Sequence, residues 1–326
     1  MAAHGTATVQ SYTSATDLLR DAAEIFAKRE VEHSVMLGVL GNLQKDMDFY
    51  HVTPQLLAVK GSGPTPLLLA TMVYPYHLVL SLAAPSASDE EVAGALQCLA
   101  DYVATVLKEK KVFPVKLMGL PALVDPFTER LAQICGDLGL RPAMSMQFYS
   151  VDPSTLVPPR LRLEDDPTLT VRPYEERDAE WMRTWIWQFH MDTFGYSQDG
   201  FVEDQLAELA RLPREACGIF LLFKGSEFVS YAAYGGATAN TLRITGAFTR
   251  EDFRGHGYGQ LAVWCACRHL LTPVADHGLG RSAVAIAADQ ANSSVMGIYK
   301  RLGFAETTEF REYVDHEGLK AVTAKP

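Results

Sequence analysis

The stretch of chain that most constrains the fold is residues 242–271, where a strand pattern runs through a glycine-spaced turn directly into a helical pattern. Apolar and polar or small residues alternate over 242–249, as in a strand with two different faces. Residues 254–259 then read Arg-Gly-His-Gly-Tyr-Gly, and residues 260–271 predict a helix. Glycines let a backbone approach a ligand closely, and the free N–H groups of a first helical turn favour phosphate. The segment therefore predicts an anion-binding loop between a strand and a helix.

Two common phosphate-binding motifs are excluded by the spacing of these glycines. The dinucleotide-binding motif G-x-G-x-x-G would need a glycine at position 260, which is occupied by Gln260. The P-loop motif G-x-x-x-x-G-K-[ST] does not occur in the chain. The loop therefore belongs to a different class of phosphate-binding turn.

A second segment follows at residues 283–304. Residues 283–288 read as a strand, and residues 292–304 read Asn-Ser-Ser-Val-Met-Gly-Ile-Tyr-Lys-Arg-Leu-Gly-Phe. With Arg254, Gly257 and Gly259, which match Q/R-x-x-G-x-G/A, this segment resembles the signature of the GNAT-type (GCN5-related) N-acetyltransferases. The resemblance covers residues 169–313. It implies an α/β fold in which a twisted, mixed, mainly antiparallel sheet is flanked by helices, with acetyl-CoA lying where the fourth and fifth strands diverge.

The resemblance also implies roles for individual residues. Asn292 would hold the pantetheine arm, and Tyr299 would donate a proton to the leaving thiolate of CoA. These two residues would share a polar helix face opposite an apolar stripe of Val295, Ile298 and Leu302. No metal is expected, because the acetyl group passes directly from one substrate to the other. The other residues expected at acetyl-CoA are Ala247, Phe248 and Thr249 for the pantetheine, and Arg254, Gly255, His256, Gly257, Tyr258, Gly259 and Gln260 for the phosphates.

The general base is not defined by a motif. Many members of this family carry a glutamate on the fourth strand, where this chain offers Arg243 and Thr245. Asp192 and Glu203 rank first, because they flank an aromatic segment that should border the acceptor site. Other candidates are a water chain, His190, Asp199 and Glu312. The aromatic segment comprises Trp181 and Trp185, expected in the core, Phe189, and Trp187, Phe194 and Tyr196, which are candidates for a pocket wall.

The two halves of the chain are related by an offset of 164 residues. Lys60-Gly61-Ser62 falls on Lys224-Gly225-Ser226, and residues 78–84 fall on 242–248. Under the same offset the glycine loop falls on residues 90–95, Glu-Glu-Val-Ala-Gly-Ala, whose carboxylates should repel a pyrophosphate. We therefore expect a flexible tail over 1–14, a degenerate GNAT-like domain over 15–152, a proline-rich linker over 153–166 and a catalytic GNAT domain over 167–326.

Composition limits the remaining possibilities. A net charge of −10 without a basic tract argues against a nucleic-acid partner. Five cysteines without a C-x-x-C pair indicate reduced, packed side chains, and neither a signal peptide nor a membrane-spanning run is recognisable. A cytoplasmic protein, monomeric or homodimeric, is expected.

The predicted function is transfer of the acetyl group of acetyl-CoA to a primary amine of a small molecule within a ternary complex. Two alternatives remain open. A protein or peptide amino group could be the acceptor, or the chain could be a sensor that binds acyl-CoA without catalysis. The missing glutamate on the predicted fourth strand supports the sensor, whereas Tyr299 and the complete glycine loop support the enzyme.

Overall fold

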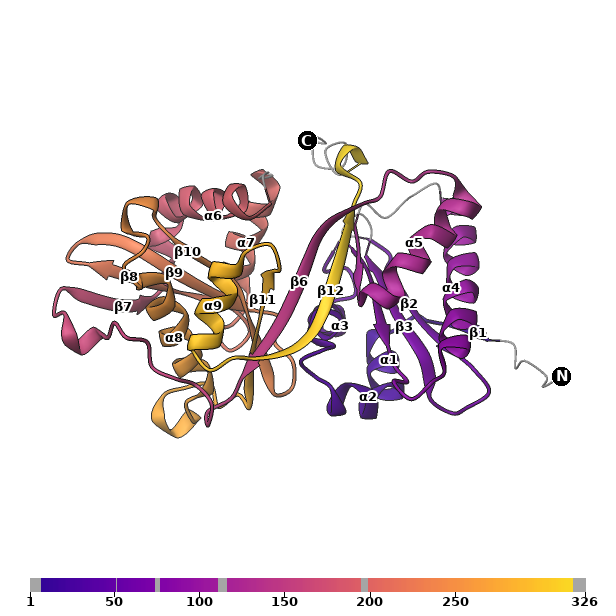
Figure 1. Ribbon diagram of the computed structural model, residues 1–326, viewed down its shortest axis with the longest axis horizontal. Helices are drawn as coiled ribbons and strands as arrows, with labels where there is room; N and C mark the ends of the chain where they lie inside the picture. The colour runs from indigo at the N-terminus through magenta and orange to yellow at the C-terminus, as the bar shows by residue number, and fades with distance from the viewer. Residues whose placement is uncertain (1–6, 51, 74–76, 111–115, 195–198, 319–326) are drawn as a thin grey trace. The chain divides into compact units, whose positions relative to one another are not determined.

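The computed structural model describes residues 7–50, 52–73, 77–110, 116–194 and 199–318 (Figure 1). The chain divides into two compact units. The first unit comprises Met1–Gln147 and Thr308–Pro326, and the second unit comprises Phe148–Thr307. No helix in the described part of the chain is both long and apolar enough to span a membrane.

The second unit contains the segment that carries the glycine loop. Its sheet has the strand order β6-β11-β10-β9-β8-β7, in which β10 and β11 are parallel while the pairs β9–β10, β8–β9 and β7–β8 are antiparallel. The mixed, mainly antiparallel sheet is thus confirmed. Its elements in chain order are η1 (Leu163–Asp165), β7 (Leu169–Pro173), η2 (Glu176–Asp178), α6 (Ala179–Phe194), α7 (Asp199–Arg211), β8 (Gly218–Lys224), β9 (Glu227–Gly235), β10 (Thr241–Thr249), η3 (Glu251–Phe253), α8 (Tyr258–Leu271), η4 (Val274–Asp276), β11 (Ala283–Asp289), α9 (Ser293–Arg301) and the start of β12 (Ala305–Val314).

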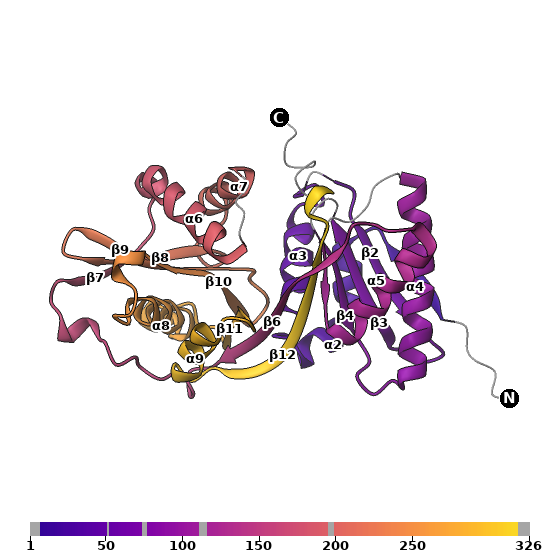
Figure 2. The same cartoon turned by 45° about the horizontal axis from the view of Figure 1, so that its top comes forward.

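Helices cover both faces of this sheet (Figure 2). On one face, α8 and α9 pack over a core that includes Leu242, Leu261, Val284 and Tyr299. On the other face, α6 and α7 pack over a second core built from Met182, Ile186, Tyr231 and other buried side chains. Ile244 of β10 faces the first core and Phe248 the second, although residues four apart on a regular strand would share one face. The bulge of β10 separates these two positions, so the usual period of two does not hold across it.

The first unit repeats the order of strands and helices of the second, except that three α-helices lie between its first two strands where the second unit has two. Its strand order is β1-β2-β3-β4-β5-β12, with β4 and β5 parallel. Its elements are β1 (Thr8–Tyr12), α1 (Ala15–Asp21), α2 (Ala23–Lys28), α3 (Ser34–Lys45), β2 (Gln55–Lys60), β3 (Pro66–Val73), β4 (His77–Leu82), α4 (Asp89–Lys110), β5 (Lys116–Gly119), α5 (Pro121–Cys135) and β6 (Arg141–Val151).

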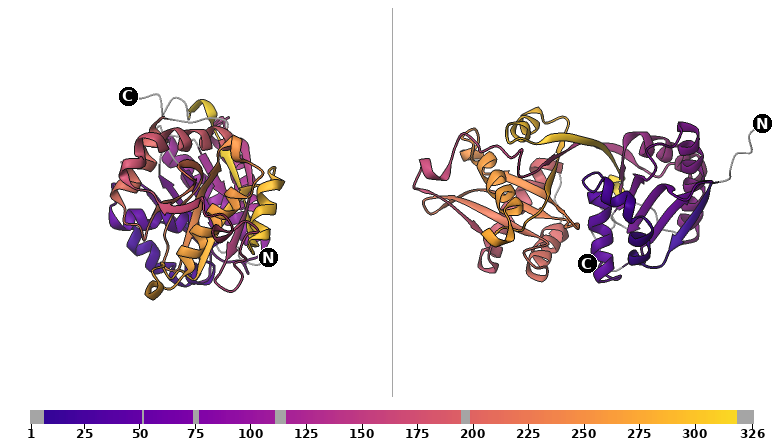
Figure 3. Two further views of the ribbon diagram at one scale, coloured as in Figure 1. Left: turned by 90° about the vertical axis from the view of Figure 1, so that its left-hand side faces the viewer. Right: turned by 90° about the horizontal axis from the view of Figure 1, so that it is seen from below.

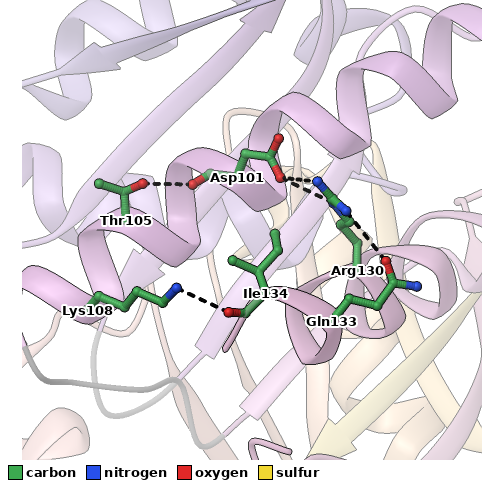
Figure 4. Close-up of polar contacts among 6 residues, drawn as sticks. All are labelled: Asp101, Thr105, Lys108, Arg130, Gln133 and Ile134. Carbon is green, nitrogen blue, oxygen red and sulfur yellow. Dashed lines mark hydrogen bonds and ion pairs between the residues drawn. The ribbon is translucent and has the colours of Figure 1, made fainter. Parts of the chain in front are cut away.

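The helices α4 and α5 of the first unit are joined by polar contacts as well as by the core beneath them (Figure 4). Arg130 on α5 donates to the carboxylate of Asp101 on α4 through Nη2 at 2.8 Å and Nε at 3.2 Å. Lys108 on α4 donates to the carbonyl of Ile134 on α5 at 3.1 Å. The pair of helices therefore covers one face of the first sheet as a single layer.

In the first unit a helix begins where the second unit has its glycine loop. Ser88 and Glu91 contact each other reciprocally: Glu91 Oε2 accepts from the Ser88 N–H at 2.9 Å, and Ser88 Oγ accepts from the Glu91 N–H at 3.3 Å. This is a capping box, which satisfies the N–H groups that a phosphate would otherwise use. With this capping box, α4 begins at Asp89, and the start of the helix does not form an open anion site.

Two strands pass from one unit into the other along the chain (Figure 3). In β6, residues up to Gln147 belong to the first unit and Phe148–Val151 to the second. In β12, Ala305–Thr307 belong to the second unit, while Thr308–Val314 pair with β5 in the first. The units therefore interleave in sequence, unlike the consecutive domains over 15–152 and 167–326 expected from the repeat.

One further expectation about the amino-terminal half differs from the structure. Residues 8–12 were expected in a flexible tail, but they form β1, which pairs antiparallel with β2 from Thr8↔Lys60 to Tyr12↔Leu56. Tyr12 is buried at the end of this strand, which explains the order. Ala22 separates the two helices that follow, α1 and α2.

The proline-rich linker lies against the second unit. Leu156, Leu161 and Leu163 pack against its α8–α9 core, and the Val157 N–H donates to the Leu302 carbonyl at 2.9 Å. A Cβ at Gly303, which has φ +90°, would lie 1.8 Å from the Thr155 carbonyl oxygen. Glycine at this position therefore lets the linker pack on the end of α9.

Candidate active site

The site is organised by a divergence of two parallel strands. β10 pairs with β11 from Thr241↔Ala283 to Ile244↔Ile286, and both strands continue beyond this pairing. The register of β10 against β9 shifts between Ile244 and Gly246, which marks a bulge at Thr245. A bulge re-aims the strand, so the second half of β10 leaves its parallel neighbour. This divergence is the feature that the sequence resemblance predicted between the fourth and fifth strands.

The glycine loop follows directly from the end of β10. Gly255 has φ +81° and Gly257 has φ +87°, both in the left-handed region that favours glycine. Gly257 is the N-cap of α8, so the first N–H groups of the helix are directed at the loop. A Cβ on Gly259 would lie 2.7 Å from Thr249 Oγ1, so glycine allows the helix start to approach the end of β10. The predicted anion-binding architecture is present.

Arg254, the cation of the loop, is held by two groups. Its Nε donates to the Thr249 carbonyl at 3.0 Å, and its Nη2 donates to Asp192 Oδ2 at 2.5 Å. The guanidinium also lies 5.8 Å from the centre of the Phe248 ring. These contacts engage the Nε–Nη2 edge of the guanidinium, and Nη1 carries two further N–H donors. The sequence did not predict this contact, because Asp192 on α6 lies 62 residues before Arg254 in the chain.

A groove of about 570 Å³ lies beside this arginine, between α6 and the residues that follow β10. Its aromatic wall is Trp185 and Phe248, whose rings lie 5.8 Å apart. The Arg250 guanidinium lies over the Trp185 ring, with its Cζ 5.4 Å from the ring centroid. Nη2 of Arg250 donates to the Asp252 carboxylate at 2.6 Å. The complete lining is Trp185, Gln188, Asp192, Phe248, Arg250, Glu251, Asp252 and Arg254.

The expected division of the aromatic segment differs in part. Trp181 and Trp185 contact Phe228 at 5.1 and 5.6 Å, as expected for core side chains, but Trp185 also lines the groove. Phe189 packs against Gly246, where an added Cβ would lie 3.3 Å from its ring. Trp187 and Phe194 are exposed on α6, and Tyr196 lies outside the described residues.

Asn292 begins α9 as its N-cap. Its Oδ1 accepts from the Val295 N–H at 3.2 Å, which satisfies one free donor of the first turn. The amide NH₂ of Asn292 can still donate to a ligand, because capping uses only the oxygen. The sequence predicted a ligand contact here and missed the capping role.

Tyr299 is the one residue of α9 that is buried. The predicted arrangement, with Tyr299 on a face opposite Val295, Ile298 and Leu302, is therefore wrong in detail. Val295 and Ile298 are partly buried, Leu302 is fully buried after the helix ends, and all of them pack on the same core as Tyr299. Much of the surface of this short helix packs against the core, so the helix does not have separate polar and apolar faces.

The surroundings of Tyr299 keep its phenol protonated. Burial raises the pKa of Tyr299 far above its ordinary value, and the neighbouring Cys267 and Tyr149 raise it further. A Tyr149 ring packs edge-to-face on it, with 6.0 Å between the centroids. Burial also raises the pKa of the Cys265 thiol to about 12 and that of Cys267 further, so neither thiol is a nucleophile. Tyr299 is thus a neutral phenol and a poor base.

The other expected cofactor residues fall around the loop. Ala247 and Thr249 are half-buried and Phe248 is buried, and Thr249 Oγ1 lies 3.0 Å from Ser230 Oγ. His256 is exposed and stacks on Tyr258 at 5.9 Å, while Gln260 lies in the first turn of α8. Tyr258 is buried and its hydroxyl accepts from Lys224 Nζ at 3.2 Å. Lys224, which the sequence pointed to only as part of the repeat, is therefore a second cation near the start of α8.

The candidate bases lie in different places. Asp192 borders the groove and accepts from Gln188 at 2.7 Å as well as from Arg254. Glu203 on α7 pairs with Arg183 on α6 at 2.6 Å, and that hydrogen bond lowers the pKa of Glu203. His190 contacts the rings of Phe189 and Phe194. The side chain of Asp199 lies outside the described part of the structure.

Glu312 is placed by β12 in the first unit, not in the unit that holds the glycine loop. It is buried there, 3.8 Å from Lys116 Nζ and 3.8 Å from His77 Nε2. Burial alone would raise the pKa of Glu312, but the hydrogen bond from His77 and the charges of Lys116 and His316 lower it overall. Glu312 is therefore a structural carboxylate of the first sheet.

Comparison with known proteins agrees with this geometry. Residues 175–304 match the model of the Acetyltransferase (GNAT) family. No curated protein sequence matches the chain at a significant level. Among solved structures, the chain is similar to a GCN5-related N-acetyltransferase from Kribbella flavida, with 16% identity, 78% of this chain and 89% of that chain covered, and a TM-score of 0.53.

Two further structures cover nearly the whole chain. A GCN5-related N-acetyltransferase from Sphaerobacter thermophilus is 11% identical and covers 94% of this chain and 95% of its own, with a TM-score of 0.56. A tandem GNAT protein from the clavulanic acid biosynthesis pathway is 10% identical and covers 94% of this chain and 97% of its own, also with a TM-score of 0.56. At these identities the likeness concerns the fold.

The second unit is a GNAT-family acyltransferase domain, and the chain as a whole has the tandem GNAT fold. The predicted family and fold class are confirmed. The GNAT fold generally binds acetyl-CoA or another acyl-CoA and transfers the acyl group to an amine. The glycine loop, the start of α8 and Arg254 supply backbone N–H donors and a cation, which are groups that suit the phosphates of such a cofactor.

Proposed function

We propose that the second unit transfers the acetyl group of acetyl-CoA directly to a primary amine of a small molecule. The observation that supports this proposal best is the divergence of β10 from β11 beside a loop with two left-handed glycines and the start of α8. The pantetheine would lie along residues 247–249, and the pyrophosphate would bind the loop from Arg254 to Gln260. Asn292 would donate its amide N–H to the pantetheine arm.

In the proposed reaction, the amine nitrogen attacks the thioester carbonyl and the carbon–sulfur bond breaks. The electron pair of that bond passes to sulfur, and the phenol of Tyr299 gives its proton to the thiolate. The attacking nitrogen loses its own proton to a base or to water. Both substrates must therefore be bound at the same time, with no covalent enzyme intermediate.

Asp192 is the better of the two carboxylate candidates for the base. It lies in the groove beside the end of β10, where an acceptor could reach the cofactor site. Both carboxylates pair with an arginine, Asp192 with Arg254 and Glu203 with Arg183, but Glu203 does not line the groove. The groove combines an aromatic wall with three carboxylates and two guanidiniums, those of Arg250 and Arg254, so one carboxylate is in excess. This excess suits a small cationic amine better than an anionic acceptor.

The test of this function is release of CoA from acetyl-CoA, followed with a thiol reagent, in the presence of amines, polyamines, amino acids and peptides. Faster release with one class of free amine supports the proposal. Release with peptides only would assign a protein or peptide acceptor.

A sensor that binds acyl-CoA without catalysis is the second candidate. It is favoured by one observation, that β10 carries Arg243 and Thr245 and no carboxylate. Binding of acetyl-CoA in a calorimeter without release across the whole panel would favour the sensor over the enzyme.

A further inference from the structure

Tyr149 stands in the amino-terminal half of the sequence but lies in the core of the second unit. It belongs to the last four residues of β6, which the second unit contains. Its side chain is fully buried in the core that also holds Tyr299. Because β6 continues from the first unit into the second, Tyr149 of the amino-terminal copy lies in the same core as Tyr299, the proposed proton donor.

The two tyrosines are in direct contact. Their ring centroids lie 6.0 Å apart with an angle of 69° between the planes, an edge-to-face arrangement. Phe304 packs on Tyr299 as well, at 5.8 Å, so the Tyr299 ring is enclosed by two aromatic side chains. A ring held in this way has little freedom to turn its hydroxyl away from the reacting sulfur.

The Tyr149 hydroxyl is the unusual feature of this contact. Its oxygen is buried, and no hydrogen-bond partner for it exists among the described residues. Leaving a buried hydroxyl without a partner is costly, so such groups commonly bind an internal water. Burial raises the pKa of Tyr149 and Glu306 raises it further, so the group stays a neutral O–H that can both donate and accept.

We propose that Tyr149 is a positioning residue for Tyr299. Its ring fixes the Tyr299 ring, and its hydroxyl holds a buried water that hydrogen-bonds to the Tyr299 hydroxyl. This inference rests on the proposed function, in which Tyr299 gives its proton to the CoA thiolate. It makes the chemistry of the second unit depend on a residue that the first copy supplies.

The kinetic test uses Tyr149→Phe, which removes only the hydroxyl, and Tyr149→Leu, which also removes the ring. We expect Tyr149→Phe to lower kcat about 10-fold and Tyr149→Leu about 100-fold, with KM for acetyl-CoA within about 2-fold of the parent, because only the transition state uses the donor. In a Tyr299→Phe background, Tyr149→Phe should have no further effect.

Tyr234→Phe is the matched control. Tyr234 is buried in the same core, and its hydroxyl donates to the Arg214 carbonyl at 3.0 Å. Its loss should lower stability and leave kcat unchanged. The proposal would be overturned if Tyr149→Phe and Tyr234→Phe lowered kcat equally. It would also be overturned if Tyr149→Phe lowered kcat as much in the Tyr299→Phe background as in the parent.

A second readout needs no acceptor substrate. Tyrosine labelled with ¹³C at Cζ gives a resonance for Tyr299 that is identified by its absence in Tyr299→Phe. This resonance should shift in Tyr149→Phe and stay in place in Tyr234→Phe. If no amine is acetylated, the proposed function fails, and an unmoved Tyr299 resonance separately overturns the contact through water.

Discussion

Tyr299 combines a role in the core with the role of proton donor that we propose for it. Its ring fills the core under α8 and α9, and the same burial keeps its hydroxyl protonated. A donor whose pKa lies far above the working pH is always in the correct state, although it gives its proton less readily than a matched acid. Its efficiency therefore depends on exact placement beside the CoA sulfur.

Replacing Tyr299 with phenylalanine keeps the ring and removes the proton. We expect kcat to fall about 100-fold while the Kd for acetyl-CoA changes less than about 2-fold. The alkaline limb of the kcat profile of the parent should show no loss below about pH 10, since the raised pKa keeps the phenol protonated there. Calorimetry and steady-state rates measure both quantities, and an unchanged kcat would remove Tyr299 as the acid.

The two candidate bases can be separated by matched amide variants. Asp192→Asn should lower kcat/KM for the amine at least about 10-fold, because it removes the carboxylate in the groove. Glu203→Gln should change it less than about 2-fold, because that carboxylate is exposed and does not line the groove. Rates with the best acceptor of the panel measure both. The reverse order would place the acceptor between α6 and α7.

His33 should make the stability of the first unit depend on pH. Burial and the charge of Arg29 lower its pKa from 6.5 to about 4, and its Nδ1 lies 2.5 Å from Ser81 Oγ. Between these two pKa values the unfolded chain binds a proton that the folded chain does not, so stability is complete above pH 6.5 and falls as the pH drops toward 4. The loss from this residue is about 3 kcal/mol.

Urea unfolding at several pH values, followed by far-UV circular dichroism, measures this loss. His33→Gln should unfold with a weaker dependence on pH over the same window. Parallel pH curves for the two proteins would show that His33 titrates normally. The fluorescence of Trp181, Trp185, Trp187 and Trp264 serves as an internal control, since all four tryptophans of the chain lie in the second unit.

At the scale of an element, the start of α8 decides whether an anion can bind. In the second unit, the N-cap of α8 is Gly257 in the left-handed conformation. In the first unit, the equivalent helix α4 begins with a capping box formed by Ser88 and Glu91. The same helix position therefore offers free N–H groups in one copy and satisfied ones in the other. This contrast explains physically why only the second copy is proposed to bind the cofactor.

Gly257→Ala tests the conformation of this loop. At φ +87° an alanine is strained, which should cost about 1–2 kcal/mol and raise the Kd for acetyl-CoA several-fold. The control is Gly94→Ala inside α4, where the new Cβ meets nothing within 4 Å and alanine should be neutral or stabilising. Calorimetry and thermal unfolding compare the two, and equal cofactor binding in Gly257→Ala would argue against this loop as the phosphate site.

At the scale of the whole molecule, each unit contains a strand segment from the other end of the sequence. In the first unit, β12 pairs Arg311–Val314 with β5 and places Glu312 beside the buried Lys116. Arg311 and the Tyr313 hydroxyl both contact the carboxylate of Asp125. The amino-terminal unit is therefore completed only when the carboxy-terminal end of the chain has been made.

A chain that ends at Thr307 should keep the second unit and weaken the first. Loss of the buried charge contacts of Glu312 alone is worth about 3–5 kcal/mol, which corresponds to a urea midpoint lower by at least about 1 M. Circular dichroism should show this early transition, while tryptophan fluorescence changes at nearly the parent concentration of urea. A chain ending at Gly318, which retains β12, is the control, and coincident early transitions by both probes would contradict independent units.

Local sequence determined much of this protein. The alternation of residues 242–249, the glycines of the loop and the Tyr299 segment are short-range signals. They predicted a strand, a turn and two helices that the structure contains, and they are the source of the proposal for Tyr299. The repeat predicted two copies with one order of elements, because hydrophobic periodicity is written along the chain.

Only the tertiary structure decided which distant residues meet. The passage of β6 and β12 between units, the contact of Asp192 with Arg254, and the placement of Tyr149 on Tyr299 depend on strand pairing and helix packing between segments far apart in sequence. A strand pattern specifies two faces but does not name the neighbouring strand. The fold class could therefore be derived from the sequence, whereas the partners around the proposed acid and base came from packing.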